Sequence, residues 1–206
     1  MTIKVFRMVF TMCFVAFLVA ACNNSELKVS SNLNQNADRS QPNIPSISID
    51  NPETLEKALK TDSLNTDIRL RLAAQYYTNK NFDKALYHYL IVYQIDQENM
   101  AALFNLGNVY YDTQQDKLAI KYYEKFLELD KNNSNVRCDL ATCYMNLNNS
   151  GKAISLLREN IKINNNHPKS HYNLSVILKQ VGKTAEADEE MKIYNNQISE
   201  QAGQDQ

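Results

Sequence analysis

Hydrophobic and small residues recur along this chain with a period of 34 residues. In four consecutive units, a leucine is followed thirteen positions later by an alanine. The leucines are Leu72, Leu106, Leu140 and Leu174, and the alanines are Ala85, Ala119, Ala153 and Ala187. A fixed period of about 20–50 residues is typical of proteins built from stacked supersecondary units. The pattern therefore predicts a repeat protein rather than a single globular core.

Within each unit the apolar residues are spaced as on two antiparallel helices, for example 101–113 and 117–129. The residue after each leucine is small, and together with the alanine it marks the place where the two helices cross. Composition agrees, because the 206 residues include only 4 glycines, and glycine weakens helix interiors. One helical hairpin cannot bury its apolar face alone, so stacked neighbours must supply the core.

The unit 100–133, MAALFNLGNVYYDTQQDKLAIKYYEKFLELDKNN, resembles the tetratricopeptide repeat (TPR) family. Its Leu106, Gly107, Tyr110, Ala119 and Tyr123 stand at the signature positions of that family. The resemblance implies an all-α fold, a right-handed α-solenoid of four TPR helical hairpins plus an N-terminal capping helix. The four repeats are expected at residues 66–99, 100–133, 134–167 and 168–201.

Two signature positions depart from the family pattern. The tryptophan position holds Arg69, Leu103, Arg137 and His171. The proline that closes each repeat is replaced by Gln97, Lys131 and Asn165. We therefore expect the turns between repeats to be a little less rigid. Asn160 stands at a position that is normally small and apolar, so it marks an expected weak point in the packing.

The two ends of the stack differ. Residues 51–65 match the end of a second helix and are expected to form a capping half-repeat, with Asn51 as N-cap and Pro52 at the first helical position. At the other end a helix is expected from Thr184 to about Ile198, with residues 202–206 as a tail. The last face, which includes Ile193 and Tyr194, is either a frayed polar cap or a surface for self-association.

The N-terminal residues are expected to be a targeting segment rather than part of the fold. Residues 1–21 combine Lys4, Arg7 and a short apolar run, which is typical of a secretory signal peptide and too short to span a bilayer. The run ends in Val-Ala-Ala followed by Cys22, which resembles the lipobox of bacterial lipoproteins. The resemblance implies acylation of Cys22, palmitate included. The alternatives are an uncleaved anchor and a plain signal peptide.

Residues 22–50 are polar and contain two prolines, so they are expected to form a lipidated flexible tether. The lipobox resemblance places the protein in the bacterial cell envelope. Because Asn rather than Asp follows the cysteine, the outer membrane is favoured if the organism has one.

Charge and motifs exclude several functions. The formal net charge of -1 disfavours a nucleic-acid binder. The sequence has no phosphate-loop, metalloprotease, nucleophile-elbow or paired-cysteine motif, so we expect neither catalysis nor a cofactor. His167 and His171 are separated by Pro168, which opposes a shared metal site. Cys138 and Cys143 diverge around one helix and are expected to be buried and unbridged.

The TPR resemblance also implies a groove lined by the first helix of each repeat. Carried over residue by residue, the groove positions are Asp67, Leu70, Ala74, Tyr77, Phe104, Asn108, Tyr111, Asp112, Cys138, Thr142, Met145, Asn146, Tyr172, Val176, Lys179 and Gln180. Apolar and aromatic side chains with polar ones at intervals suit an extended peptide or an amphipathic helix. Leu70 and Ala74 replace the Lys and Asn of the TPR domains that clamp a carboxylate, so that subclass is excluded.

The sequence thus predicts a membrane-anchored scaffold for protein or peptide partners, acting in envelope complex assembly. The alternative is an accessory or recruitment subunit of an envelope enzyme complex. The membrane would be contacted through the N-terminal lipid.

Overall fold

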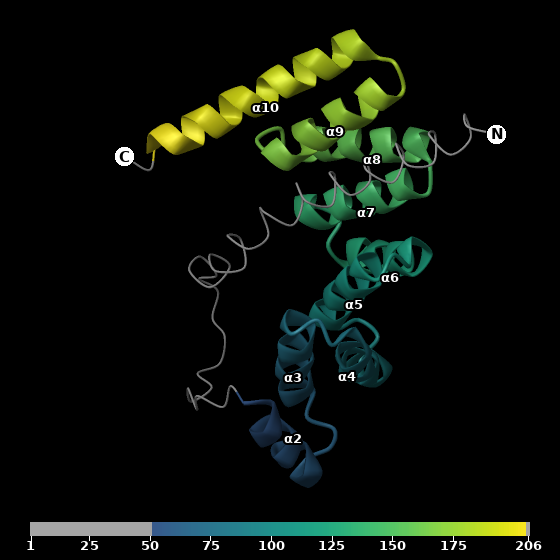
Figure 1. Ribbon diagram of the computed structural model, residues 1–206, viewed down its shortest axis with the longest axis vertical. Helices are drawn as coiled ribbons and strands as arrows, with labels where there is room; N and C mark the ends of the chain where they lie inside the picture. The colour runs from purple at the N-terminus through teal and green to yellow at the C-terminus, as the bar shows by residue number, and fades with distance from the viewer. Residues whose placement is uncertain (1–50, 205–206) are drawn as a thin grey trace, which may run out of the picture. The chain divides into compact units, whose positions relative to one another are not determined.

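The computed structural model describes residues 51–204. The signal peptide, Cys22 and the tether lie outside the described residues, so the predictions made for them stay predictions. Within 51–204 the regular elements are all helices (Figure 1). They are α2 (Pro52–Thr61), α3 (Thr66–Thr78), α4 (Phe82–Ile95), α5 (Met100–Asp112), α6 (Asp116–Leu129), α7 (Ser134–Asn146), α8 (Ser150–Ile163), α9 (Pro168–Gln180) and α10 (Thr184–Gln204). None of these helices is long and apolar enough to cross a membrane.

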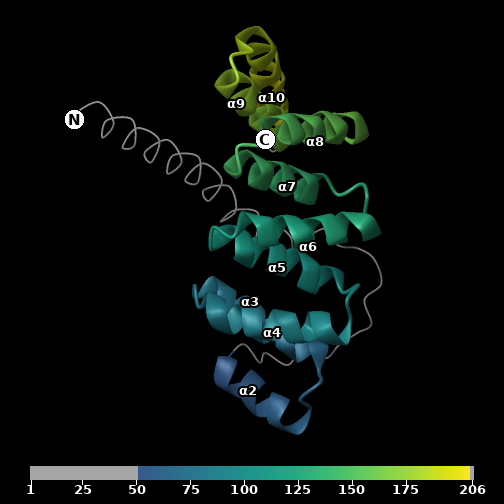
Figure 2. The ribbon, with the colours of Figure 1, turned by 90° about the vertical axis from the view of Figure 1, so that its right-hand side faces the viewer.

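The helices pair in the order that the 34-residue period predicts. Four hairpins, α3–α4, α5–α6, α7–α8 and α9–α10, follow one another, and each helix packs mainly against its neighbours in sequence (Figure 2). α2 packs on α3 and buries Leu55 and Leu59. Asn51 caps α2 by accepting a hydrogen bond from the Glu53 amide, and Pro52 occupies the first turn. The prediction of an all-α repeat solenoid with a capping helix is confirmed.

Small residues allow the two helices of a hairpin to approach closely. The four alanines of the repeat are buried, each exposing no more than 2% of its surface. Gly107 on α5 lies directly against the Tyr123 ring on α6, and a Cβ there would sit 2.3 Å from Cε1 of that ring. Real Cβ contacts are never this short, so only glycine fits while Tyr123 keeps its place.

The turns inside the hairpins share one backbone conformation. Their fifteenth repeat positions all have positive φ: Lys80 at 57°, Gln114 at 59°, Asn148 at 59° and Gly182 at 81°. Paired amide–carbonyl bonds close each turn, as in Asn81 N–H to Tyr76 O and Lys80 N–H to Tyr77 O, both 2.8 Å. This is the Schellman motif, which usually places glycine at the left-handed position. Three of the four turns adopt it without glycine.

The turns between repeats lack the signature proline but are closed by side chains. At three of the four degenerate tryptophan positions a polar residue donates a hydrogen bond to the carbonyl six residues earlier, whereas Leu103 at the fourth cannot. These bonds run from Arg69 to Ser63, from Arg137 to Lys131 and from His171 to Asn165. Aspartate or asparagine at the start of the turn also accepts an amide bond, as in Glu98 N–H to Asp96 Oδ1. These bonds brace the turns where proline is missing, and the expectation of slightly less rigid turns stays a prediction.

The last helix is longer than predicted. α10 continues to Gln204, so the helix includes the start of the segment expected to be a tail from residue 202. In α2, α6 and α8 one position bonds to the next repeat: Glu56 accepts from Tyr76, Glu124 accepts from Tyr144, and Arg158 donates to Glu186, whereas α4 has Leu90 there. The equivalent residue of α10 is Lys192, which is exposed, as are Asp188 and Asn195 on the same face. The face formed by Asp188, Lys192 and Asn195 is polar, whereas Ile193 and Ile198 of the same helix are 39% and 41% exposed, so self-association at this end stays a prediction.

Candidate functional site: the groove on the first helices

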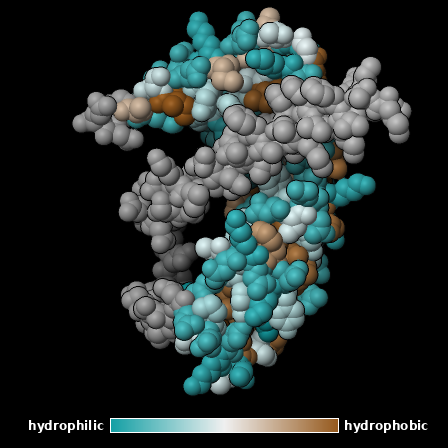
Figure 3. Space-filling model, viewed as in Figure 1, coloured by the Kyte–Doolittle hydropathy of each residue, from teal (hydrophilic) through white to brown (hydrophobic). Residues whose placement is uncertain are grey.

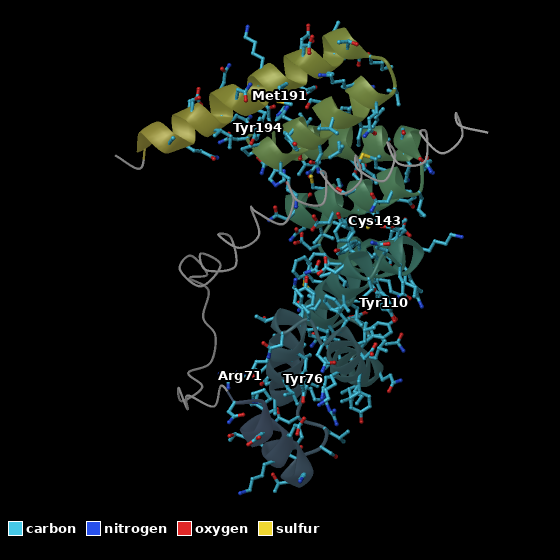
Figure 4. All side chains as sticks on the ribbon, in the orientation of Figure 1. Arg71, Tyr76, Tyr110, Cys143, Met191 and Tyr194 are labelled. Atoms are coloured by element: carbon cyan, nitrogen blue, oxygen red, sulfur yellow. The ribbon has the colours of Figure 1, made fainter. Side chains whose placement is uncertain are left out.

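The predicted groove residues on α3, α5, α7 and α9 remain at the surface, with one exception. Ala74 and Asp112 are exposed, and Leu70, Tyr77, Phe104, Tyr111, Met145 and Tyr172 are half-buried. Asn108, Thr142 and Val176 are half-buried as well. Figure 4 places Arg71 on the side of α3 that faces away from α4, whereas Tyr110 lies toward α6. The exposure of the predicted positions is therefore what places them on a side of the first helices that helix pairing leaves open.

The exception is Cys138, which was predicted as a groove residue but is completely buried. Asn173 of α9 donates to its sulfur at 3.2 Å and also approaches the Thr142 hydroxyl at 3.4 Å. The Asn173 carboxamide therefore covers the Cys138 thiol, so Asn173 rather than Cys138 lies at the surface there. Cys138 and Cys143 are both buried, as predicted, and burial raises the pKa of the Cys143 thiol far above its usual range.

The aromatic side chains of the groove are held by contacts within the protein. The Tyr77 hydroxyl donates to Asp112 Oδ2 at 2.6 Å, which joins α3 to α5. The Phe104 ring centre lies 6.1 Å from that of Phe126, and the Tyr172 ring centre lies 5.2 Å from that of Tyr194. These side chains have little rotamer freedom left to lose when a partner binds, which favours binding.

Asparagine amides stand between these apolar side chains. Asn108 accepts from the buried Tyr123 hydroxyl at 2.7 Å. Asn105, Asn146 and Asn173 use their amide groups as donors to the Ala101 carbonyl, Asp116 and Cys138. Sequence reasoning missed Asn105 and Asn173. The signal was available, because both stand at the sixth position of their repeat, one residue after a predicted groove position.

Acidic groups in the groove are largely compensated. Lys169 of α9 lies 2.8 Å from Asp139 of α7, so this carboxylate is paired. Although the Asp112 residue is exposed as a whole, partial desolvation of its carboxyl group raises its pKa, while the hydrogen bond from Tyr77 and the charge of Lys80 act in the opposite direction. In Figure 3, hydrophobic side chains form separate patches among hydrophilic ones on the visible face of the described residues.

One cluster resembles a catalytic arrangement but is structural. His167 Nδ1 lies 2.7 Å from Ser170 Oγ, and Nε2 lies 3.0 Å from Asn135 Oδ1. Ser170 is fully buried, so no substrate can reach its hydroxyl. Burial lowers the pKa of His167 to about 4, so the ring is neutral near pH 7. A neutral ring that accepts at Nδ1 and donates at Nε2 satisfies both contacts.

Asn160 completes this cluster. It is fully buried, donates to the Ser134 carbonyl at 2.9 Å and to Ser170 Oγ at 2.7 Å, and leaves its Oδ1 without a partner. The predicted weak point in the apolar packing is therefore a polar junction that ties α8 to α7 and α9. The described residues contain no cluster of His, Cys, Asp and Glu able to hold a metal ion.

Comparison with known proteins agrees with this architecture. Residues 112–191 match the family model described as anaphase-promoting complex, cyclosome, subunit 3, a TPR-like repeat family. No curated protein matches the chain.

Solved structures of MamA have a similar fold. One crystal structure of MamA has a TM-score of 0.70 at 18% sequence identity, covering 74% of this chain and 89% of that chain. MamA from Desulfovibrio magneticus RS-1, residue 41 to the end, has a TM-score of 0.69 at 14% identity, covering 73% of this chain and 85% of that one. MamA AMB-1 has a TM-score of 0.62 at 24% identity, covering 70% and 85%.

At these identities the likeness concerns the fold. Together with the partial family match, it shows that this chain is an all-α solenoid of TPR-like repeats and supports a TPR family for it.

Proposed function

We propose that this protein is a membrane-anchored interaction scaffold that binds a peptide or helix from a partner protein in the groove of α3, α5, α7 and α9. TPR-like folds generally mediate protein–protein interaction. The observation that carries the proposal is the row of half-buried apolar and aromatic side chains, Leu70, Tyr77, Phe104, Met145 and Tyr172, on the open side of the first helices. Aromatic residues held in place at a surface are the usual anchors of protein interfaces.

Anchoring is the second part of the proposal and is supported by the sequence. The lipobox-like Val-Ala-Ala before Cys22 supports acylation, and the polar segment 22–50 would let the repeats act at a distance from the lipid. More than one acyl chain is needed for stable attachment. In this setting the scaffold would assemble complexes of the bacterial envelope, with the outer membrane favoured where one exists.

Site-specific photo-crosslinking tests groove binding. A photoreactive residue at Ala74, exposed in the groove, should capture a partner in membranes. The same residue at Tyr87, 61% exposed on α4, serves as the matched control and should not. Ala74→Arg should abolish capture at a second groove site, Val176, whereas Tyr87→Arg should not. Identical capture profiles at the groove and control positions would refute the groove hypothesis.

The anchor is tested separately with Cys22→Ala. This variant should lose incorporation of labelled palmitate and move from the membrane to the soluble fraction. Continued labelling would exclude acylation at this cysteine.

The alternative is an accessory subunit that recruits an enzyme of the envelope. It shares the groove and differs in the partner. If the captured partner is an enzyme whose activity on its own substrate falls in the Ala74→Arg strain, the accessory role is favoured. A captured structural component favours assembly.

A further inference from the structure

We propose that the groove selects an uncharged, extended segment of its partner rather than a charged peptide or a helix. This inference rests on the proposed function and specifies the chemistry of the same site. Three features of the groove support it: its charge balance, the free atoms of its carboxamides, and the placement of its apolar side chains.

The charges on the first helices cancel. Apart from the residues that brace the turns, the charged side chains of α3, α5, α7 and α9 are three acids and three bases. They are Asp67, Asp112 and Asp139, and Arg71, Lys169 and Lys179. Lys169 and Asp139 are already paired with each other at 2.8 Å. A groove without net charge neither steers nor favours a charged partner, and a charged segment would lose hydration there without compensation.

The carboxamides present hydrogen-bonding atoms that the backbone of a helix cannot use. Asn105, Asn146 and Asn173 spend N–H groups on contacts inside the protein, at 2.8 Å, 2.9 Å and 3.2 Å, and their carbonyl oxygens accept no hydrogen bond within the described residues. Asn108 has the opposite arrangement: its carbonyl oxygen accepts a hydrogen bond from the Tyr123 hydroxyl, and its NH₂ group remains available as a donor. All four side chains are half-buried or exposed. The groove thus offers acceptors from three repeats and a donor from one of them.

An extended backbone is the partner that matches these atoms. In a helix the main-chain N–H and C=O groups bond to each other, whereas an extended segment leaves both unpaired. Side chains of an extended segment also alternate in direction, so every second one can contact apolar groove residues such as Leu70, Tyr77 and Phe104. A helix in this groove would leave the carboxamide oxygens facing apolar side chains, which is unfavourable.

A random dodecamer peptide library, displayed on phage and selected on the folded chain, tests the inference. We expect the enriched peptides to be close to neutral, with apolar residues at alternate positions. Synthetic copies should bind with a Kd that changes by less than about threefold between 50 mM and 500 mM salt, because screening acts only on charges. Their bound conformation, followed by NMR, should be extended.

The carboxamides are tested by the double variant Asn105→Ala, Asn173→Ala. Loss of two hydrogen bonds should weaken the selected peptides about tenfold. Asn196→Ala, at an exposed asparagine of α10, is the matched control and should leave the Kd unchanged. Circular dichroism of each variant establishes that the repeats remain folded.

The outcomes separate this inference from the proposed function. Groove-dependent peptides that are strongly charged, lose more than tenfold in affinity at high salt, or bind as helices would overturn the inference and leave the groove function standing. Peptides that bind the Ala74→Arg variant as well as the unmodified chain would overturn both.

Discussion

The first two repeats and the last two are built on the same 34-residue period but are held together by different chemistry. Between α4, α5 and α6 the contacts are aromatic: Tyr122 stacks on Tyr110 and meets Tyr93 edge-on, with ring centres 5.5 Å apart in both pairs. Between α7, α8 and α9 the contacts include buried polar groups, with Asn160, Ser170 and His167 in one hydrogen-bonded junction. The period therefore specifies where helices cross, and leaves open which forces hold them.

The difference has energetic consequences. Ring contacts depend weakly on direction, whereas buried hydrogen bonds cost free energy as soon as one partner is lost. In a repeat protein each unit contacts only its neighbours, so a local change affects local stability. We therefore expect the ring contacts between α4, α5 and α6 to tolerate loss of polar atoms, and the junction between α7, α8 and α9 to depend on them.

The largest effect is expected where an aromatic contact leaves no room. Gly107→Ala would place a methyl group against the Tyr123 ring and should lower the free energy of unfolding by about 2–3 kcal/mol. Gly151→Ala is the matched control, since a Cβ there meets nothing within 4 Å and should be neutral or slightly stabilising. Urea unfolding gives the free energies, and hydrogen exchange should place the loss in α5 and α6. Equal effects of the two variants would contradict the close approach.

Substitutions that remove polar atoms but keep the side-chain size compare the stability of the first two repeats with that of the last two. Asn160→Leu leaves the Ser134 carbonyl and Ser170 without their donor and should cost about 2 kcal/mol. Tyr122→Phe keeps the stacked ring of the first half and should cost less than about 0.5 kcal/mol. The comparison fails if Tyr122→Phe is the more damaging substitution in urea unfolding.

Acid should affect the polar junction. The unfolded His167 ring binds a proton near pH 6.5, and the folded ring binds one only near pH 4 because it is buried. The stability that this ring contributes is therefore complete above about pH 6.5 and is lost as the pH falls toward 4. Burial and the charge of Arg69 lower the pKa of His88 in the first half as well, so both halves should weaken.

Replacement of each histidine resolves the two contributions. His167→Gln should flatten the pH dependence of unfolding between pH 6.5 and 4 and remove the acid-induced rise in exchange in α7–α9. His88→Gln should act on α3 and α4 instead. An unchanged pH profile in His167→Gln would exclude the junction as an acid-sensitive element.

The smallest effect concerns the turns, where the two halves also differ. Gln114 of the first half has φ of 59°, whereas the last turn has glycine at the same place. Gln114→Gly should stabilise the chain by about 0.5–1 kcal/mol, and Gly182→Ala should destabilise it by a similar amount. Thermal unfolding detects both. A loss of stability in Gln114→Gly would show that the glutamine side chain contributes more than the strain it imposes.

Much of the fold could be predicted because the helix-crossing residues are visible as columns. Gly107 and the four alanines lie where the two helices of a hairpin approach each other closely, so only small side chains fit there. The capping helix could be predicted from Asn51 and Pro52, whose roles are local. Local hydrogen bonds and the period together were enough to assign the helices and their order.

The candidate site was harder because it depends on contacts across repeats. Cys138 has the spacing of a groove residue, but Asn173, 35 positions later, covers it. Arg69, Arg137 and His171 each donate a hydrogen bond to a carbonyl on the far side of a turn. From the sequence alone, these residues look like departures from the signature tryptophan, and nothing indicates that they form hydrogen bonds. The extension of α10 to Gln204 has no strong signal, since polar residues follow Ile198 in helix and tail alike.

The polar face of α10 bears on how such arrays end. Asp188, Lys192 and Asn195 stand where α6 carries Ile120, Glu124 and Leu127, and where α8 carries Ile154, Arg158 and Ile161. A fifth unit docking there would have to dehydrate the Asp188 carboxylate and the Asn195 amide, at positions where earlier units place isoleucine or leucine. Lengthening the array by design would therefore begin with the exchange of Asp188 and Asn195 for apolar side chains.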